Sequence, residues 1–75
     1  MNERTQLNLD ILRDVHEAKK NAIIKASKAV QRAINENSFM DELEHAKSNL
    51  NLALIRENID YENRVKLIES EDKQP

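Results

Sequence analysis

Residues 11–34 read ILRDVHEAKKNAIIKASKAVQRAI, and this stretch decides the fold. Apolar residues return in it at spacings of four, three and four, which is the pattern of one face of an α-helix. The row with this spacing consists of Ile11, Val15, Ala18, Ala22, Ala26, Ala29 and Ala33. The row repeats every eleven residues. Because that period is about 3.67 residues per helical turn, it predicts a nearly straight helix.

The second half of the chain carries a matching apolar row. Its members are Phe39, Leu43, Ala46, Leu50, Leu54, Tyr61, Val65 and Ile68, and Glu57 interrupts it. Between the two rows lies the polar stretch 35–38, where Ser38 and Asp41 have the spacing of a helix-capping box. We therefore expect an all-α fold, an antiparallel two-helix hairpin with helices over residues 6–35 and 39–69.

Length and composition agree with a single small helical domain. The chain has 75 residues, no Gly, no Cys, and its one Pro is the last residue. Nothing in the interior carries the strongest helix breaker, and no thiol or glycine-rich phosphate loop is available. We expect residues 1–69 to form one hairpin domain and residues 70–75 to be a disordered tail.

The N-terminal region and the apolar content bear on location. Residues 1–10 lack the basic region and apolar run of a signal peptide. No apolar stretch approaches the roughly 20 residues of a membrane span. Together with the absence of Cys, this predicts a cytoplasmic protein.

Each predicted helix carries more apolar surface than a hairpin buries. The first has a second row, formed by Leu12, Ile23, Val30 and Ile34, and the second has another, formed by Leu52, Ile55 and Ile59. Exposed aliphatic rows of this kind usually mark a contact with another protein, so we predict these seven residues as partner-binding. The alternative is that they are scattered surface residues or thicken the core.

The histidines do not predict a catalytic or metal site. His16 and His45 lie on different predicted helices, far apart in an antiparallel pairing. That pairing places His16 opposite Glu57 and Leu12 opposite Tyr61. No thiol or carboxylate cluster accompanies the His16–Glu57 pair, so we interpret it as a structural polar contact. We expect no enzymatic activity, no metal and no cofactor.

Charge is distributed unevenly along the chain. Residues 1–37 carry seven Lys/Arg and five Asp/Glu, whereas residues 38–75 carry five and nine, which gives the total of −2. A face with Lys25, Lys28 and Arg32 suggests nucleic-acid binding as one possible function. A pI of about 5.6 and the scarcity of aromatic residues disfavour it.

The layout resembles a known family, the small helical-hairpin co-chaperones of type III secretion needle subunits. The resemblance rests on size, on an alanine-containing first helix that ends in a polar turn, and on a second helix richer in large aliphatic residues. The first of these helices ends ASKAVQRAINEN at residues 26–37. The resemblance implies a bacterial cytoplasmic protein that pairs with a larger helical-repeat chaperone, the two together keeping the needle subunit unpolymerised before export.

Two functional hypotheses follow from the apolar rows. The first is a protein-binding adaptor or co-chaperone, whose rows dock into a groove of the partner. The second is a self-associating regulator, in which two hairpins form a four-helix bundle. Membrane insertion is not expected.

Overall fold

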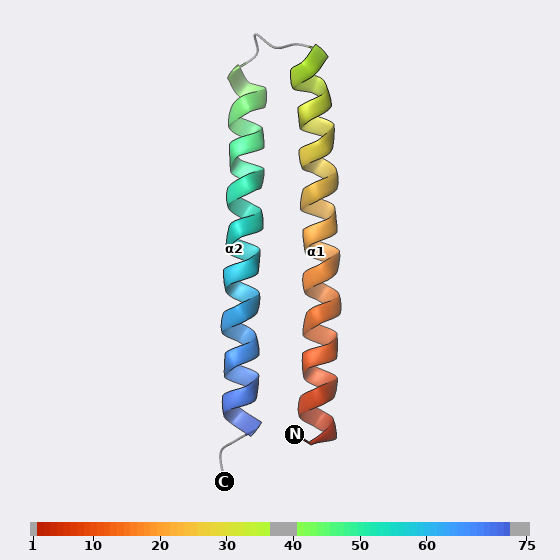
Figure 1. Ribbon diagram of the computed structural model, residues 1–75, viewed down its shortest axis with the longest axis vertical. Coiled ribbons are helices and arrows are strands. Elements are labelled where there is room, and N and C mark those ends of the chain that lie inside the picture. The colour runs from red at the N-terminus through yellow and green to blue at the C-terminus, as the bar shows by residue number, and fades with distance from the viewer. Residues whose placement is uncertain (1, 37–40, 73–75) are drawn as a thin grey trace.

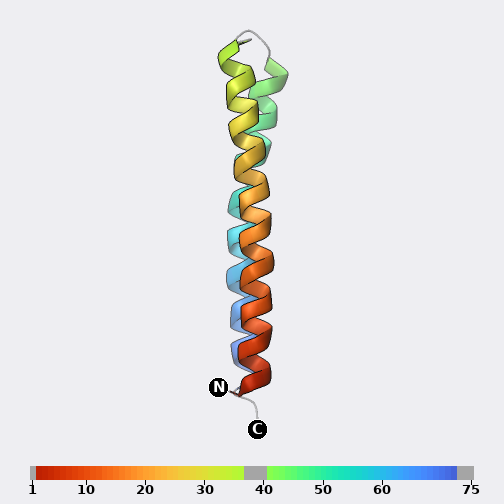
Figure 2. The ribbon, with the colours of Figure 1, turned by 90° about the vertical axis from the view of Figure 1, so that its right-hand side faces the viewer.

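The computed structural model describes residues 2–36 and 41–72, and these form an antiparallel helical hairpin. Helix α1 is Glu3–Glu36 and helix α2 is Asp41–Asp72. The two helices lie side by side along their whole length, with both termini at the same end (Figures 1 and 2). The hairpin is 59 Å long and 15 by 10 Å across. The all-α hairpin predicted from the sequence is confirmed.

Helix α1 begins earlier than predicted because Asn2 caps it. The side-chain Oδ1 of Asn2 accepts a hydrogen bond from the backbone N–H of Thr5 at 2.7 Å, and its carbonyl accepts one from Gln6 at 3.0 Å. This is the geometry of an N-cap, which satisfies amides that the helix itself leaves unpaired. Glu3 in the first turn adds a carboxylate at the positive end of the helix dipole.

Helix α2 ends later than predicted. Residues 70–72 belong to the helix, so the expectation of a tail starting at residue 70 is wrong for these three positions. Thr5 of α1 donates a hydrogen bond to Asp72, which ties the last turn of α2 to the first turn of α1. The predicted capping box at Ser38 and the apolar position Phe39 lie outside the described residues.

The seam between the helices follows an eleven-residue spacing. On α2 the residues predicted to face α1 are half-buried, and so is Glu57, which interrupts their row as expected. The described members of that row are Leu43, Ala46, Leu50, Leu54, Tyr61, Val65 and Ile68. On α1 the buried or half-buried positions along the seam follow one another at three or four residues; they are Thr5, Leu9, Leu12, His16, Lys20, Ile23, Ser27, Val30 and Ile34. Asp10, Gln31 and Ala33 are half-buried beside them. An eleven-residue repeat corresponds to about 3.67 residues per turn, close to the period of a straight α-helix.

The face of α1 that packs on α2 is therefore not the predicted one. Ile11 and Val15 are 53% and 45% exposed, and Ala18, Ala22, Ala26 and Ala29 are exposed as well, with only Ala33 half-buried. The seam instead takes the row that contains Leu12 and Ile23. Leucine, isoleucine and valine remove more apolar area from water than alanine does, so this face gains more free energy by packing on α2.

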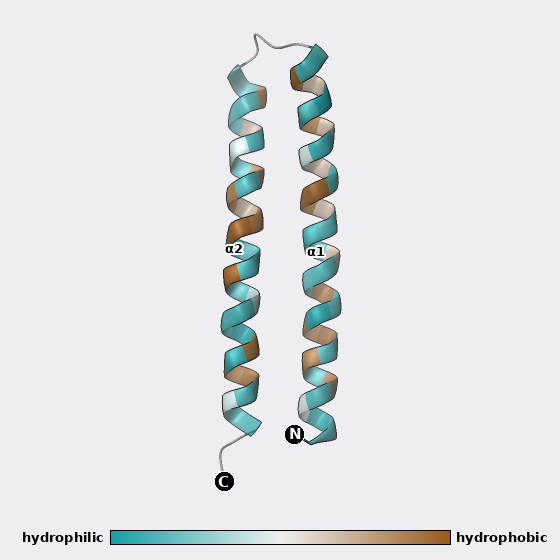
Figure 3. Ribbon diagram, viewed as in Figure 1, coloured by the Kyte–Doolittle hydropathy of each residue, from teal (hydrophilic) through white to brown (hydrophobic). Residues whose placement is uncertain are grey.

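The hairpin leaves much apolar surface uncovered. Among residues 2–36 and 41–72, the only side chains that are buried are those of Thr5 and His16. Apolar colour appears on the outer edge of α2 as well as on the edge that faces α1 (Figure 3). Neither α1 nor α2 has a segment both long and apolar enough to cross a membrane.

The observed seam predicts different contributions to stability from two neighbouring isoleucines. Ile23 lies in the seam and is half-buried, whereas Ile24 is 37% exposed. We expect Ile23→Ala to lower the free energy of unfolding by about 2 kcal/mol, because it removes packed apolar atoms. Ile24→Ala serves as the matched control and should change it by less than about 0.5 kcal/mol. Urea unfolding followed by circular dichroism measures both, and equal losses would contradict the seam described here.

Candidate protein-binding surface

The centre of the seam holds a polar cluster of His16, Glu57 and Tyr61. His16 is only 5% exposed, and its Nδ1 lies 3.3 Å from Oε1 of Glu57. The ring of His16 stacks on that of Tyr61, with centroids 4.0 Å apart and planes 6° from parallel. The predicted pairing of His16 with Glu57 is confirmed. The antiparallel pairing predicted that Tyr61 lies opposite Leu12, but the Tyr61 ring stacks on that of His16.

This cluster has the geometry of a structural contact. A general base has to reach the proton that it removes from a substrate. The His16 ring is enclosed by the stacked tyrosine and the carboxylate of Glu57, and its side chain is only 6% exposed. In the described part of the chain, no three His, Cys, Asp or Glu side chains are placed to hold a metal ion. The second histidine, His45, is exposed on α2.

Two further polar contacts join the helices near their ends. At the terminal end, the hydroxyl of Thr5 donates to Oδ1 of Asp72 at 2.7 Å, and this bond holds the pKa of Asp72 below its ordinary value of 3.8. At the other end, the ammonium group of Lys47 donates to Oε1 of Gln31. With the His16–Glu57 contact between them, these contacts fix which residues of the two helices face each other.

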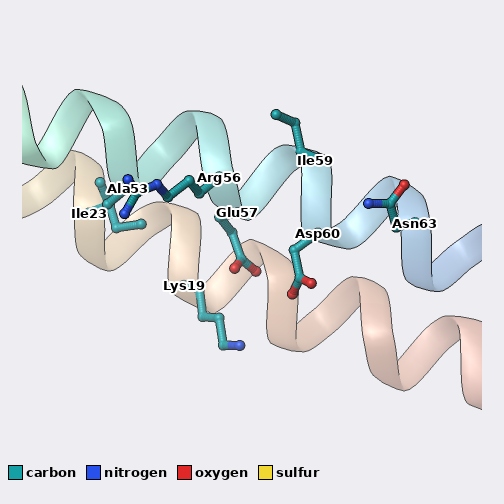
Figure 4. A pocket seen from close by; sticks show the side chains of 8 residues that line it. All are labelled: Lys19, Ile23, Ala53, Arg56, Glu57, Ile59, Asp60 and Asn63. Carbon is teal, nitrogen blue, oxygen red and sulfur yellow. The ribbon is translucent and has the colours of Figure 1, made fainter.

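Leu52, Ile55 and Ile59 form an exposed row on α2, which we call the outer row. They are 48%, 54% and 54% exposed. Figure 4 shows Ile59 pointing away from α1, whereas Glu57 and Asp60 extend toward it. These three predicted binding residues therefore lie on a surface that the hairpin does not cover. Their binding role remains a prediction.

The other four predicted binding residues lie elsewhere. Leu12, Ile23, Val30 and Ile34 are half-buried in the seam, so the expectation that the hairpin leaves them uncovered is wrong. Their role in partner binding remains a prediction. They pack against α2 because their spacing continues the row of Leu9 and His16. A partner reaches them only where the seam is open at its edge.

A second exposed apolar surface was not predicted. Leu7, Ile11 and Val15 on α1 and Leu67 on α2 are 58%, 53%, 45% and 64% exposed. We call these four residues the terminal face, because they lie on the half of the hairpin that contains the termini. The His16–Glu57 pair is the signal in the sequence that identifies this face. Because the pair places His16 in the seam, helix geometry places Ile11 and Val15 to one side of the seam.

An open groove lies beside the seam in the middle of the hairpin (Figure 4). Its apolar part comes from Ile23, Ala53 and Ile59. Its polar part carries both charge signs and consists of Lys19, Arg56, Glu57, Asp60 and Asn63. The groove connects the edge of the seam with the outer row at Ile59.

The basic residues proposed for nucleic acid are exposed on α1. Lys25, Lys28 and Arg32 lie at solvent-accessible positions of the helix. A solvated basic face has the same appearance, and phosphate binding there remains a prediction.

Comparison of the chain with protein-family models, with curated proteins and with solved structures found no match.

The polar pair predicts coupling between His16 and Glu57. We expect single changes to alanine at either position to destabilise the hairpin, and the double change to cost about 0.5–3 kcal/mol less than their sum. The exposed pair formed by Asp60 and Arg64, 3.1 Å apart within α2, is the control, with an expected coupling of about 0.3–0.5 kcal/mol. Unfolding free energies of the two mutant cycles give both values. Strict additivity at His16 and Glu57 would show that the pair does not act as a unit.

Proposed function

We propose that this chain is a non-enzymatic, protein-binding adaptor of the co-chaperone kind. The observation that carries the proposal is the outer row. Leu52, Ile55 and Ile59 follow one another at three and four residues, and each is about half exposed. Such a row forms a ridge on one side of a helix, which fits a hydrophobic groove on another protein.

The size of the outer row limits what it contributes to binding. Covering the exposed half of each of its three side chains contributes about 1 kcal/mol per residue. Association costs about 4 kcal/mol or more in lost freedom of motion. The row therefore acts as an anchor, and a partner also has to contact the polar residues around it. Asn51, Arg56, Asn58 and Glu62 are exposed on the same helix and supply hydrogen-bonding groups.

The enclosed histidine supports a role without catalysis. His16 and Glu57 form a polar contact inside the seam, and Tyr61 stacks on the His16 ring. A buried polar contact of this kind serves to select one pairing of the helices over its neighbours.

The resemblance to the small co-chaperones of type III secretion needle subunits narrows the proposal. A two-helix hairpin of 75 residues is the architecture that the resemblance implies. On this proposal the chain acts in the bacterial cytoplasm. It binds a larger helical-repeat chaperone, and the pair keeps a needle subunit unpolymerised. The support is the architecture and the uncovered aliphatic ridge, which suits a groove between helical repeats.

The proposal predicts that a charge in the outer row removes partner binding. Ile55→Asp places an ion at the middle of the ridge, where docking would have to desolvate it. The wild-type chain, used as bait in a bacterial cytoplasmic extract, should retain a helical-repeat protein identified by mass spectrometry, and Ile55→Asp should lose it at least tenfold. Because Ile55 is 54% exposed, the variant should keep its helical circular dichroism.

Asn21→Asp is the matched control for this experiment. It adds the same charge at an exposed position of α1 and should leave partner recovery unchanged. Equal recovery with Ile55→Asp, or recovery of no helical-repeat protein by the wild-type chain, would count against the proposal.

A further inference from the structure

The terminal face has a different shape from the outer row. Leu7, Ile11 and Val15 are four residues apart along α1 and form a ridge. Leu67 of α2 lies across the seam from this ridge and is the most exposed large apolar residue of the four, at 64%. The terminal face is therefore built from both helices, whereas the outer row belongs to α2 alone.

An open groove runs between the two helices along this face. Its apolar walls come from Ile11, Val15 and Leu67, with Leu12 and Ile68 from the seam, and its polar rim consists of Asn8, Arg64 and Glu71. A ridge and a groove therefore lie next to each other on the same surface. In a two-fold dimer each copy presents the same surface to the other, so a ridge beside a groove is self-complementary.

We propose that the terminal face binds a second copy of this chain, so that two hairpins form a four-helix bundle about a two-fold axis. The Leu7–Ile11–Val15 ridge of each copy then lies in the groove of the other. This proposal uses a surface separate from the outer row and does not depend on the function proposed above.

The exposed area of the isolated hairpin supports a second copy. The chain exposes 5977 Å², whereas a compact monomer of 8.7 kDa exposes about 4,700 Å² by the usual scaling with mass. The excess is about 1,200 Å², and a standard interface buries about 800 Å² on each partner. An interface of that size with one further hairpin therefore removes about two thirds of the excess.

The charges at the rim also fit an identical partner. Arg64 and Glu71 have opposite signs and line the same groove. A two-fold axis across this face brings the Arg64 region of one copy toward the Glu71 region of the other, so two identical faces meet without like-charge repulsion. Within its own chain, Nε of Arg64 lies 3.1 Å from Oδ2 of Asp60.

Sedimentation equilibrium of the full chain tests the proposal. At about 100 μM, we expect a mass twice the 8.7 kDa of the chain. Ile11→Glu places a charge in the ridge and should reduce the mass to that of one chain at the same concentration. Ile55→Glu is the matched control, since Ile55 is equally exposed but lies in the outer row, and it should remain a dimer. A monomeric wild-type chain, or a dimer lost with Ile55→Glu but kept with Ile11→Glu, would overturn the proposal.

Cysteine cross-linking gives a second readout that does not depend on how well the Ile11→Glu variant folds. The chain has no Cys, so single substitutions at Leu7, Ile11, Val15 and Leu67 each introduce one thiol. The position nearest the two-fold axis should form an intermolecular disulfide at least ten times faster than a thiol introduced at Ile55. Equal rates at all five positions would show that the terminal face does not meet itself.

Discussion

Two helices have only one seam between them, and this constraint governs the rest of the structure. Each helix contributes a single narrow strip to the contact, and the hairpin is only 15 by 10 Å across. In the described ranges 2–36 and 41–72, every apolar residue is more exposed to solvent than Thr5 and His16 are. A chain of this size gains little free energy from its own core. Aliphatic residues outside the seam therefore remain at the surface, where another polypeptide can cover them.

Polar contacts determine how the two helices are aligned within this seam. A row of half-buried residues that repeats every eleven residues offers similar packing after a shift of one repeat. The Thr5–Asp72, His16–Glu57 and Gln31–Lys47 contacts are satisfied in one alignment only. They lie near the two ends and the middle of the seam. Their contribution is thus to specificity of pairing, while the apolar residues between them supply the packing.

Much of the fold was predictable from the sequence because helix periodicity is a local property. The absence of Gly and of internal Pro, the polar stretch around residues 35–38 and the row through Leu50 and Leu54 predicted the hairpin and the α2 face. The pairing of His16 with Glu57 also followed from antiparallel geometry. The start of α1 was placed too late because the Asn2 cap lies five residues before Leu7, the first apolar residue of the helix.

The face of α1 was not predictable from spacing alone. Two apolar rows compete on that helix, and the alanine-rich row has the more regular pattern. The seam takes the row with Leu12 and Ile23 because larger side chains bury more area. Of the predicted binding residues, Leu52, Ile55 and Ile59 lie on the surface as expected. The face of α2 that packs on α1 was predicted correctly, and these three residues lie outside that face. The terminal face was missed because two of its residues, Ile11 and Val15, had been assigned to the row that packs on the other helix.

We expect the hairpin alone to be marginally stable and to gain stability when its uncovered apolar faces are buried. The most direct test is the thermal unfolding midpoint of the full chain measured over a wide range of protein concentration. We predict that the midpoint rises by several degrees between about 5 and 500 μM, because association favours the folded state by mass action. A midpoint that is high and independent of concentration over this range would contradict the account, since it would show that the single seam is sufficient.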